Sequence, residues 1–376
     1  MNTAAYSTWL EIDLAAIRQN VSELRRISAV PVMAIVKANG YGHGMVEAGR
    51  AALQGGASWL GVARIEEALG LRAAGITQPI LVLGYTAAQR CAEAVEHDIR
   101  LAVFDVDLAA AYASEAARLG RRLRVHAKFD SGMGRLGVFP EQGVLFVRRL
   151  MELPGLELEG AFTHFARADE PQADTTDWQL QRFQSLLSEL GQAGLRPALV
   201  HAANSAAALY FPAARLDMVR SGIAIYGLDP SAEAPLPETF RPALTWKARL
   251  TGVKILPPRH GVGYAYRYTT RADERIGTVA VGYADGLRRR VGNYALVRGQ
   301  QVPLAGGVCM DQIMLQLDEI PAACAGDEVV LIGRQGQAVI RAEDLGREWN
   351  TVNYDVVCGL QARVPRIYLN RWDEAA

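Results

Sequence analysis

The sequence predicts an α/β protein with an N-terminal (β/α)8 barrel of the TIM type, followed by a smaller, mostly β C-terminal domain. Three observations support this prediction. Short apolar runs alternate with amphipathic stretches from Ile12 to about Tyr226. Four prolines then lie within a few residues of one another. Beyond Thr245 the helical periodicity largely disappears. We place the barrel at residues 1–240 and the β domain at residues 241–376.

Eight apolar runs in the first part are typical of buried parallel strands, because each is short and is followed by a helical pattern. Strands that alternate with helices pair in parallel through right-handed crossovers. Eight of them in roughly 200 residues favour a barrel over an open doubly wound sheet. The expected strands are Val32–Val36, Trp59–Val62, Ile80–Leu83, Leu101–Val103, Leu123–Phe129, Leu158–Phe162, Ala198–His201 and Met218–Val219. Helical patterns include Arg64–Ala74, Leu108–Leu119, Glu141–Met151 and Asp177–Leu190.

The second part contains runs that end in Gly, Asp and Pro turns, which is the pattern of a β domain. Residues 1–11 are candidates to pair with this domain rather than with the barrel. The clustered prolines Pro230, Pro235, Pro237 and Pro242 indicate a linker between the domains. The expected strands are Leu244–Ile255, Arg275–Val281, Tyr294–Val297, Ile313–Leu317 and Glu328–Ile332.

The overall composition argues against several classes of function. Forty basic and forty acidic residues give a net charge of zero, so no electrostatic argument favours binding to nucleic acid or to an anionic membrane. No apolar run approaches the length of a membrane span, and the N-terminus lacks the pattern of a secretion signal. The four cysteines are far apart, which suits reduced thiols in a cytoplasmic protein.

Polar residues follow most of the expected barrel strands, at the ends where barrels of this kind place their chemistry. Lys37 follows the first strand, and its position alone is compatible with four roles: binding an anion, pairing with a carboxylate, forming an imine or reaching out to solvent. Each of the others is also found as an ordinary rim residue. Together these residues are Lys37, Lys128, Asp130, Thr163, His164, His201, Asn204, Ser205 and Arg220.

The composition of this rim argues against a metal site and for an anionic ligand. Only Asp130 offers a carboxylate, beside two lysines and two arginines, whereas divalent ions need carboxylates or thiolates close together. Ser205 and Gly222 belong to the two loops that build phosphate sites in such barrels. A reactive lysine with a phosphate site points to pyridoxal 5'-phosphate, held by Lys37 as an imine.

Together with further motifs, these residues resemble those of the bacterial alanine racemase family, which depends on pyridoxal phosphate. The resemblance runs nearly the whole length of the chain. Seven motifs occur in the family's order, which is far more specific than any one of them. They are Val36–Gly44, Lys128–Gly137, Asn204-Ser205, Arg220–Gly227, Gly282–Gly286, Cys309–Gln312, and Asn353-Tyr354 with Arg363–Arg366.

The resemblance implies two catalytic bases, because racemisation needs a base on each face of the α-carbon. Lys37 would hold the cofactor and act as one base, and Tyr264 would be the other. His164 and Arg220 resemble the residues that form a hydrogen-bonded chain towards that tyrosine. Arg220 also resembles the residue that faces the pyridine nitrogen. Because an arginine donates and does not accept, the ring would stay unprotonated, which favours proton exchange over decarboxylation.

The resemblance also implies the remaining contacts. Arg135 would bind the substrate carboxylate and the cofactor's phenolic oxygen, and Lys128 resembles a lysine that is carbamylated and orients that arginine. Tyr283, Met310 and Asp311 match the substrate pocket. With Tyr264, Met310 and Asp311 would come from the partner of a head-to-tail homodimer. Asn204 would be a further cofactor-binding residue. The residues that would hold the phosphate are Tyr41, Ser205, Gly222, Ile223 and Tyr354.

Some positions depart from the family pattern, and other functions stay open. Gly40, Gly263, Ala265 and Gly307 stand where alanine, serine, glycine and arginine are commoner. The leading hypothesis is interconversion of L- and D-alanine, which supplies D-alanine for peptidoglycan. A serine or broad-specificity racemase is the first alternative. A barrel-type decarboxylase of basic amino acids and a non-catalytic carrier of pyridoxal phosphate are less favoured, because Arg220 and the β domain oppose them.

Overall fold

Eight parallel strands form a nearly closed barrel in the computed structural model, which describes residues 5–290 and 292–371. The barrel belongs to a compact unit of residues 16–241, here called the barrel unit. The residues up to Ala15 and from Pro242 onward form a second one, the β unit. Each expected strand of the barrel is present. The strands are β2 (Val32–Ile35), β3 (Trp59–Val62), β4 (Ile80–Val82), β5 (Ile99–Val103), β6 (Leu123–Lys128), β7 (Leu156–Phe162), β8 (Leu199–His201) and β9 (Val219–Ser221).

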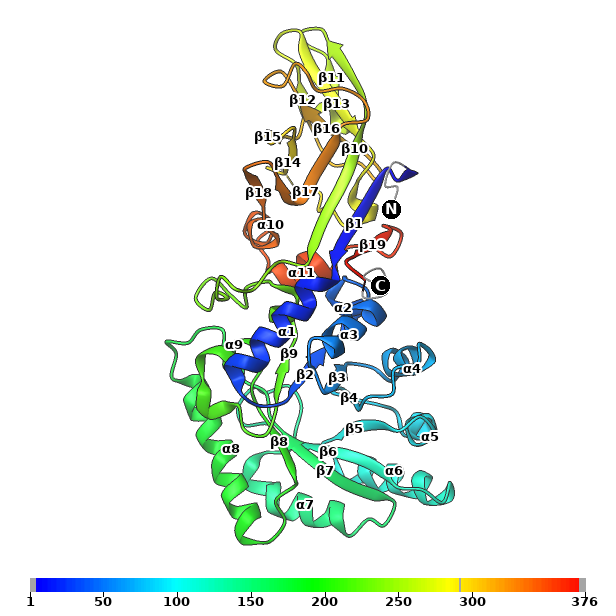
Figure 1. The fold of residues 1–376 in the computed structure, drawn as a ribbon, viewed down its shortest axis with the longest axis vertical. Coiled ribbons are helices and arrows are strands. Elements are labelled where there is room, and N and C mark those ends of the chain that lie inside the picture. The colour runs from blue at the N-terminus through cyan, green and yellow to red at the C-terminus, as the bar shows by residue number, and fades with distance from the viewer. Residues whose placement is uncertain (1–4, 291, 372–376) are drawn as a thin grey trace. The chain divides into compact units, whose positions relative to one another are not determined.

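The strands follow one another around the barrel in chain order, with β9 returning beside β2 (Figure 1). Strands β8 and β9 share no regular ladder, but two backbone bonds tie their surroundings together. The Asp217 N–H donates to Val200 O at 3.0 Å, and the Arg220 N–H donates to Ala203 O at 2.9 Å. Short parallel strands with helical crossovers therefore give the predicted (β/α)8 architecture.

Helices cover the outside of the barrel, and the four that the sequence predicted are present with slightly different ends. The longest are α8 and α1, and α6 begins where Asp105 caps it by accepting the Leu108 N–H at 2.8 Å. The segment labelled α2 (Lys37–Tyr41) is a left-handed turn and not a regular helix. The helices are α1 (Leu14–Ser28), α3 (Met45–Gln54), α4 (Ile65–Ala73), α5 (Cys91–Glu96), α6 (Val106–Arg118), α7 (Gly143–Met151), α8 (Thr175–Gln192) and α9 (Ser205–Tyr210).

The inside of the barrel is apolar on one side and polar on the other. Near β2 and β3, a Cβ added to Gly61 would lie 2.4 Å from Ile35 Cδ1 and 3.0 Å from Met33 Sδ, so apolar side chains fill that part tightly. Along β6, by contrast, His126 and Lys128 share one face of the strand and both are buried. Barrel interiors are usually packed with branched apolar residues, so a polar interior on this side needs a reason.

The β unit contains a nine-stranded sheet built around the long strand β10 (Leu244–Leu256). Strand β1 (Thr8–Asp13) pairs antiparallel with β10 and parallel with β19 (Arg366–Leu369), so both ends of the described chain belong to this sheet. All five strands that the sequence predicted here are present. The other strands are β11 (Gly261–Val262), β12 (Tyr268–Thr269), β13 (Glu274–Val279), β14 (Tyr294–Val297), β15 (Gln300–Pro303), β16 (Ile313–Gln316), β17 (Glu328–Gln335) and β18 (Ala338–Ile340).

Two short helices of the β unit, α10 (Ala342–Glu348) and α11 (Asn353–Cys358), were not predicted. Each is shorter than two full turns, so its residues carry too little periodicity to be detected. The start of α10 is fixed by a capping bond, in which the Arg341 N–H donates to Asp344 at 2.8 Å.

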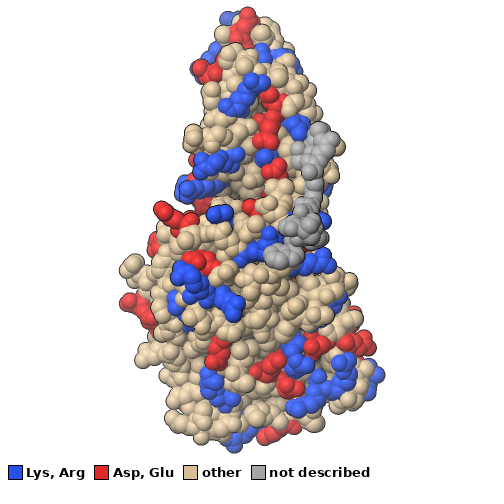
Figure 2. Space-filling view, in the orientation of Figure 1, with Lys and Arg blue, Asp and Glu red and all other residues tan. Residues whose placement is uncertain are grey.

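Surface charges of both signs are interspersed on the face shown in Figure 2, in line with the net charge of zero. Several of them pair with each other, as Arg182 does with Glu141 at 2.5 Å. In the parts of the chain that the structure describes, no helix combines the length and the apolar character that crossing a bilayer requires.

Substitution by alanine should have opposite effects on stability at two glycines of the barrel unit. A Cβ on Gly155 would lie 2.0 Å from Ala113 O, so Gly155→Ala must push α6 away from the start of β7. We expect a loss of stability of about 1–3 kcal/mol, as for other overpacked sites. A Cβ on Gly191, near the end of α8, meets nothing within 4 Å. Gly191→Ala should therefore stabilise by up to about 1 kcal/mol through helix propensity. Thermal and urea unfolding midpoints would test both, and equal effects of the two substitutions would contradict the packing described.

Candidate functional site

Lys37 lies directly after β2, at the start of a turn with an unusual backbone. The next four residues, Ala38 to Tyr41, have φ values of 52°, 53°, 63° and 51°. This left-handed conformation is rare for residues other than glycine and is strained. The Gly40 N–H donates to Val36 O and the Gly44 N–H to Asn39 O, both at 2.8 Å, and these bonds hold the turn. Strain of this kind collects at functional sites.

Glu67, on α4, braces this turn against the next loop of the barrel. One carboxylate oxygen accepts the Ala38 N–H at 2.6 Å. The other accepts the Ala63 N–H at 2.8 Å and the Arg64 N–H at 3.2 Å. Sequence reasoning missed this residue. The N-cap residue three positions before Glu67 is Arg64, so the Ser, Thr, Asp or Asn that completes a capping-box signature is missing and no sequence signal pointed to this brace.

Four of the residues predicted to bind the cofactor adjoin one another at the ends of β8 and β9. A Cβ on Gly222 would lie 2.4 Å from the Tyr41 hydroxyl, so this glycine permits the close approach of Tyr41. The Ser205 hydroxyl accepts the Gly222 N–H at 3.1 Å and the Ala224 N–H at 3.4 Å. Asn204 caps α9 by accepting the Ala207 N–H at 3.0 Å, which fixes Ser205 at its first position. Hydroxyls and backbone N–H groups that converge in this way suit a phosphate.

Arg220, on β9, is almost fully buried, with 3% exposed, and its hydrogen-bond acceptors among the described residues are uncharged. Nη2 donates to Thr163 O and to Ala202 O, both at 2.8 Å, and lies 3.1 Å from His164 Nδ1. Nη1 lies 2.9 Å from His201 Nδ1. Burial, with a contribution from Arg135, lowers the pKa of Arg220 to about 9, so the guanidinium stays charged at neutral pH.

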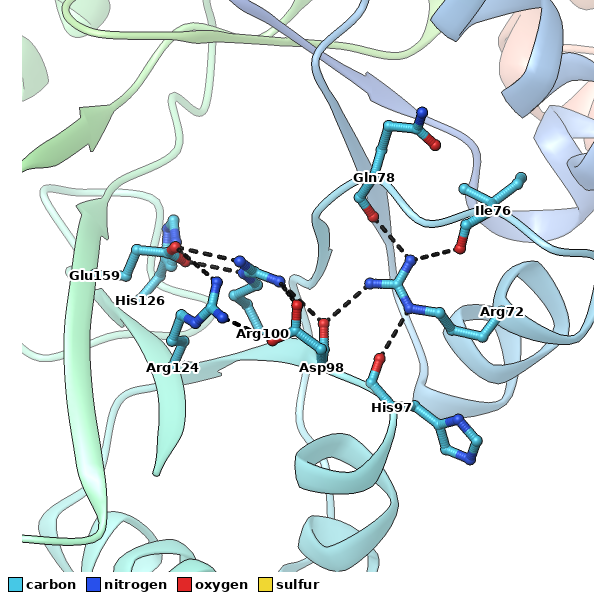
Figure 3. A network of polar contacts seen from close by, with 9 residues as sticks. All are labelled: Arg72, Ile76, Gln78, His97, Asp98, Arg100, Arg124, His126 and Glu159. Atoms are coloured by element: carbon cyan, nitrogen blue, oxygen red, sulfur yellow. Dashed lines mark hydrogen bonds and ion pairs between the residues drawn. The ribbon is translucent and has the colours of Figure 1, made fainter. Parts of the chain in front are cut away.

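The polar half of the barrel interior continues from His201 towards the N-terminal ends of the strands. His201 Nε2 lies 2.9 Å from His126 Nδ1, and His126 Nε2 lies 3.2 Å from Glu159. Figure 3 shows the lower part of this column, where Arg100 and Asp98 follow. Arg100 Nε donates to Glu159 at 3.1 Å, and Nη1 donates to Asp98 at 2.8 Å. Sequence reasoning found His201 but missed the others, although alternate polar residues in Arg124–Lys128 are a signal of a polar interior.

Lys128, at the end of β6, has an unusual environment for a lysine. Its side chain is 4% exposed, donates to Phe129 O at 2.6 Å and lies 5.3 Å from the centre of the Phe162 ring. Burial, together with the positive charges of Arg220 and Arg135, lowers the pKa of Lys128 to about 7. A substantial fraction of this amine is therefore uncharged at neutral pH, which makes it a nucleophile.

The loop after Lys128 carries the other charged residues of this rim. One oxygen of Asp130 accepts the N–H groups of Gly132, Met133 and Gly134 at 2.9, 2.8 and 3.2 Å. Burial raises the pKa of Asp130, but these three bonds outweigh it and lower the pKa overall. Asp130 therefore shapes the turn that carries Arg135, which is exposed. His164, half-buried, has its pKa lowered well below the usual range by burial and by neighbouring cations that include Lys37.

Tyr264, in the β unit, is 70% exposed and lines a pocket of about 560 Å³ together with Met310 and Asp311. The backbone on both sides of this tyrosine is left-handed, with φ of 68° at Gly263 and 59° at Ala265. Serine, commoner in the family at the first position, would be strained there. The turn thus projects the Tyr264 side chain outward from the sheet.

The Met310–Asp311 loop is held from two sides. The Tyr283 N–H donates to Cys309 O and the Ala284 N–H to Met310 O, both at 3.0 Å. Arg363 bridges two carboxylates, binding Asp285 at 2.9 Å and Asp311 at 2.8 Å. Sequence reasoning included Arg363 in a motif but gave it no role. The structure shows that it fixes the orientation of Asp311.

The predicted site residues thus fall into two groups, one in each unit. Lys37, Tyr41, Lys128, Arg135, His164, Asn204, Ser205, Arg220, Gly222 and Ile223 belong to the barrel unit. Tyr264, Tyr283, Met310, Asp311 and the half-buried Tyr354, on α11, belong to the β unit.

Comparisons with known proteins agree over nearly the whole chain. A family model described as alanine racemase, N-terminal domain, matches residues 12–230, and one described as alanine racemase, C-terminal domain, matches residues 243–368. A protein of Symbiobacterium thermophilum named alanine racemase is 49% identical over 365 residues, which cover 96% of this chain and 97% of that protein.

Solved structures extend the comparison to three dimensions. A crystal structure of alanine racemase from Bacillus anthracis with bound L-Ala-P matches with a TM-score of 0.91 at 41% identity, covering 97% of this chain and 95% of that chain. A histidine racemase from Leuconostoc mesenteroides matches with a TM-score of 0.89 at 31% identity, covering 98% of this chain and 100% of that chain.

The bracing role of Glu67 predicts that Glu67→Gln loosens the turn after Lys37. An amide has only one accepting oxygen, so the substitution must break the bond to Ala38 or the bonds to Ala63 and Arg64. We expect faster hydrogen exchange at these amides and a loss of about 1–3 kcal/mol of stability. Glu66→Gln is the matched control, because Glu66 pairs with Arg90 at the surface and should change little. Unchanged exchange at Ala38 in the first variant would contradict the bracing role.

Proposed function

The chain belongs to the alanine racemase family, and from this premise we propose that it interconverts L- and D-alanine with Lys37 and Tyr264 as its two bases. The observation that carries the proposal is the grouping of Lys37, the Tyr41–Ser205–Gly222 cradle and the buried guanidinium of Arg220 in one unit. This grouping offers a reactive amine, a phosphate site and a donor-only cation together. Supply of D-alanine to peptidoglycan, in the cytoplasm, is part of the same proposal.

The residues present fit pyridoxal 5'-phosphate, the cofactor of this family. Lys37 would hold its aldehyde, and Tyr41 and Ser205, with Gly222, Ile223 and Tyr354, would hold its phosphate. When bound, this group withdraws electrons from the α-carbon of an attached amino acid and so weakens the α-C–H bond. The absence of a side chain at Gly222 supports the fit, because any Cβ there would lie 2.4 Å from the Tyr41 hydroxyl and fill the cradle.

Arg220 supports racemisation rather than decarboxylation. A guanidinium donates hydrogen bonds and cannot accept one, so a ring nitrogen that faces Arg220 keeps its lone pair and takes up no proton. An unprotonated ring is a weaker electron acceptor than a protonated one. The residues around the α-carbon then remove and return a proton without further bond breaking. A carboxylate at this position would instead accept a hydrogen bond from a protonated ring nitrogen, which would stabilise the protonated ring and favour the other reactions.

Two bases are required because one side chain cannot reach both faces of a flat carbon centre. Lys37 serves one face, and Tyr264 serves the other, helped by a hydrogen-bonded chain through His164 and Arg220. The exposure of Tyr264 supports its supply to a second copy of the chain in a head-to-tail homodimer. Apolar side chains around it are also exposed, and such patches mark interaction surfaces. The exposed fraction is 70% for Tyr264 itself, 72% for Tyr266, 43% for Tyr283 and 53% for Met310.

Arg135 would bind the substrate carboxylate, and Lys128 would orient it as a carbamate. In carbamylation the uncharged amine of Lys128 adds to carbon dioxide, and one proton leaves, giving an anionic N-carboxylate. The lowered pKa of Lys128 supports this assignment. Met310, Asp311 and Tyr283 would complete the substrate pocket.

A broader substrate range is the second candidate, and one comparison favours keeping it. The structural match to a histidine racemase shows that this fold accommodates a larger substrate in a relative 31% identical. Tyr354 supports alanine in this chain, because a bulky aromatic at the pocket edge limits the size of the substrate side chain. Decarboxylation of basic amino acids is opposed by Arg220, and a carrier role is opposed by the pocket of the β unit.

The two-base proposal predicts different defects for its two residues. Lys37→Ala should abolish both the absorbance of the bound cofactor and turnover. Tyr264→Phe should keep the cofactor and lose about 10²- to 10⁴-fold in racemisation of alanine, while Lys37 still exchanges the α-proton of one enantiomer for deuterium. Tyr266→Phe is the matched control, because this exposed neighbour should lose little. The readouts are α-deuterium exchange and chirality analysis with alanine, serine, lysine and arginine. Robust racemisation by Tyr264→Phe would refute the assignment of that base, and carbon dioxide release would refute the reaction.

Carbamylation of Lys128 should depend on pH around 7. Because the pKa is lowered to about 7, the amine is mostly charged at pH 6 and mostly neutral at pH 8, so modification should increase between these values. The chain has four lysines, and Lys247 is a built-in control. Burial lowers its pKa, but Glu11 and Glu328 outweigh burial and raise it, which keeps Lys247 charged. A ¹³C carbamate resonance in ¹³C-bicarbonate that persists in Lys128→Arg would show that another amine, a second lysine or the α-amino group, carries the modification.

A further inference from the structure

The proton positions in the column below Arg220 follow from its two ends. A guanidinium can only donate, so His201 Nδ1, 2.9 Å from Arg220 Nη1, must accept. The proton of a neutral His201 then lies on Nε2, which donates to His126 Nδ1 at 2.9 Å. By the same step the proton of His126 lies on Nε2, which donates to Glu159 at 3.2 Å. The guanidinium donor at one end and the carboxylate at the other thus set the same donor-to-acceptor direction for every hydrogen bond from Arg220 to Glu159.

The two imidazoles are held in place by packing as well as by these bonds. Both are fully buried. The ring of His201 stacks on Phe162 with centres 5.0 Å apart, and His126 meets the edge of Trp59 at 5.5 Å. A Cβ on Gly160 would lie 2.5 Å from His126 Nδ1, the atom that accepts from His201. Gly160 therefore leaves the space in which the two histidines meet.

The far end of the column is anchored by charge. Glu159 accepts from Arg100 at 3.1 Å, and Arg100 also binds Asp98 at 2.8 Å. Arg72 donates to Asp98 O at 3.0 Å, which ties the anchor to the N-terminal ends of the strands (Figure 3). Burial raises the pKa of Glu159, but hydrogen bonds from His126 and Arg100 outweigh it and lower the pKa to about 2. Glu159 is therefore ionised throughout the neutral range.

We propose that His201, His126 and Glu159 are positioning residues, which form a one-way hydrogen-bond relay that transmits the charge of a carboxylate to Arg220. The carboxylate polarises His126, which polarises His201 and makes its Nδ1 a stronger acceptor for the guanidinium. The relay stabilises the buried cation and fixes its orientation while no carboxylate touches it. The contribution of the relay to catalysis rests on the proposed function, whereas the proton positions within the relay do not depend on it.

Neither histidine needs to change its charge for the relay to operate. His126 faces Glu159, Arg100, Arg220 and His201, and burial lowers its pKa in spite of the bond to Glu159. His201 faces Arg220, His126 and Lys128, and burial lowers its pKa well below the usual range. Both imidazoles therefore remain neutral at pH 7, as a relay that works by polarisation requires.

The first test uses the unmodified full-length chain. The chain has six histidines, so ¹⁵N-histidine labelling gives a readable spectrum, and His126→Gln and His201→Gln assign the resonances. We expect both residues to be neutral with the proton on Nε2 from pH 6 to pH 8. A proton on Nδ1 of either residue, or a charged imidazole, would overturn the relay. This outcome is independent of whether the chain racemises alanine.

The second test removes the charge and keeps the shape. Glu159→Gln should shift the Nε2–H resonances of both histidines to higher field and lower kcat about tenfold, as outer partners of functional histidines typically do. KM should change by no more than about twofold. Glu157→Gln is the matched control, because Glu157 lies two residues earlier on β7 and is exposed. If the resonance of His201 and kcat respond equally to both variants, the charge is not transmitted and the proposal fails. Should Glu159→Gln not fold, the proton positions in the unmodified chain decide alone.

Discussion

A guanidinium buried inside a barrel is the constraint on which the candidate site depends. Taking a charge out of water costs several kcal/mol unless hydrogen bonds replace the lost solvent. Arg220 obtains its bonds from two carbonyls and two imidazoles, and these acceptors need partners of their own. His201 therefore needs an acceptor for its own proton, which is His126, and His126 needs one in turn, which is Glu159. The polar half of the barrel interior is thus the consequence of placing one cation at its end.

The sequence was a good guide to the scaffold because apolar periodicity is a local property. Every predicted strand of the barrel is present, and so are the five predicted strands of the second unit. The short helix α11 and the two-residue strands β11 and β12 were not predicted, because segments this short are too brief to show a hydrophobic period. The polar column escaped for a different reason. His126 and Glu159 are 33 positions apart, and only the register of β6 against β7 brings them together.

The two turns that carry the proposed bases have a common physical feature in the backbone. The turn after Lys37 and the turn around Tyr264 both contain consecutive residues with positive φ. Such turns are strained for most residues, so each needs external support. The first receives it from Glu67 and the second from its place between β11 and β12. Both proposed bases therefore lie on segments whose shape is set by the surrounding structure rather than by local preference.

The distance between the charge of Glu159 and the guanidinium of Arg220 bears on what the site can do. A carboxylate in direct contact would occupy two of the five N–H groups of the guanidinium in a bidentate pair. Those N–H groups would then be oriented to the carboxylate, and the cation would be partly neutralised at the place where it acts. With two imidazoles between them, the carboxylate acts on the guanidinium only through neutral groups. His201 then occupies one N–H of Nη1. The barrel thus compensates the buried charge and keeps Arg220 a donor towards the candidate site, and the proposed preference for racemisation rests on this property.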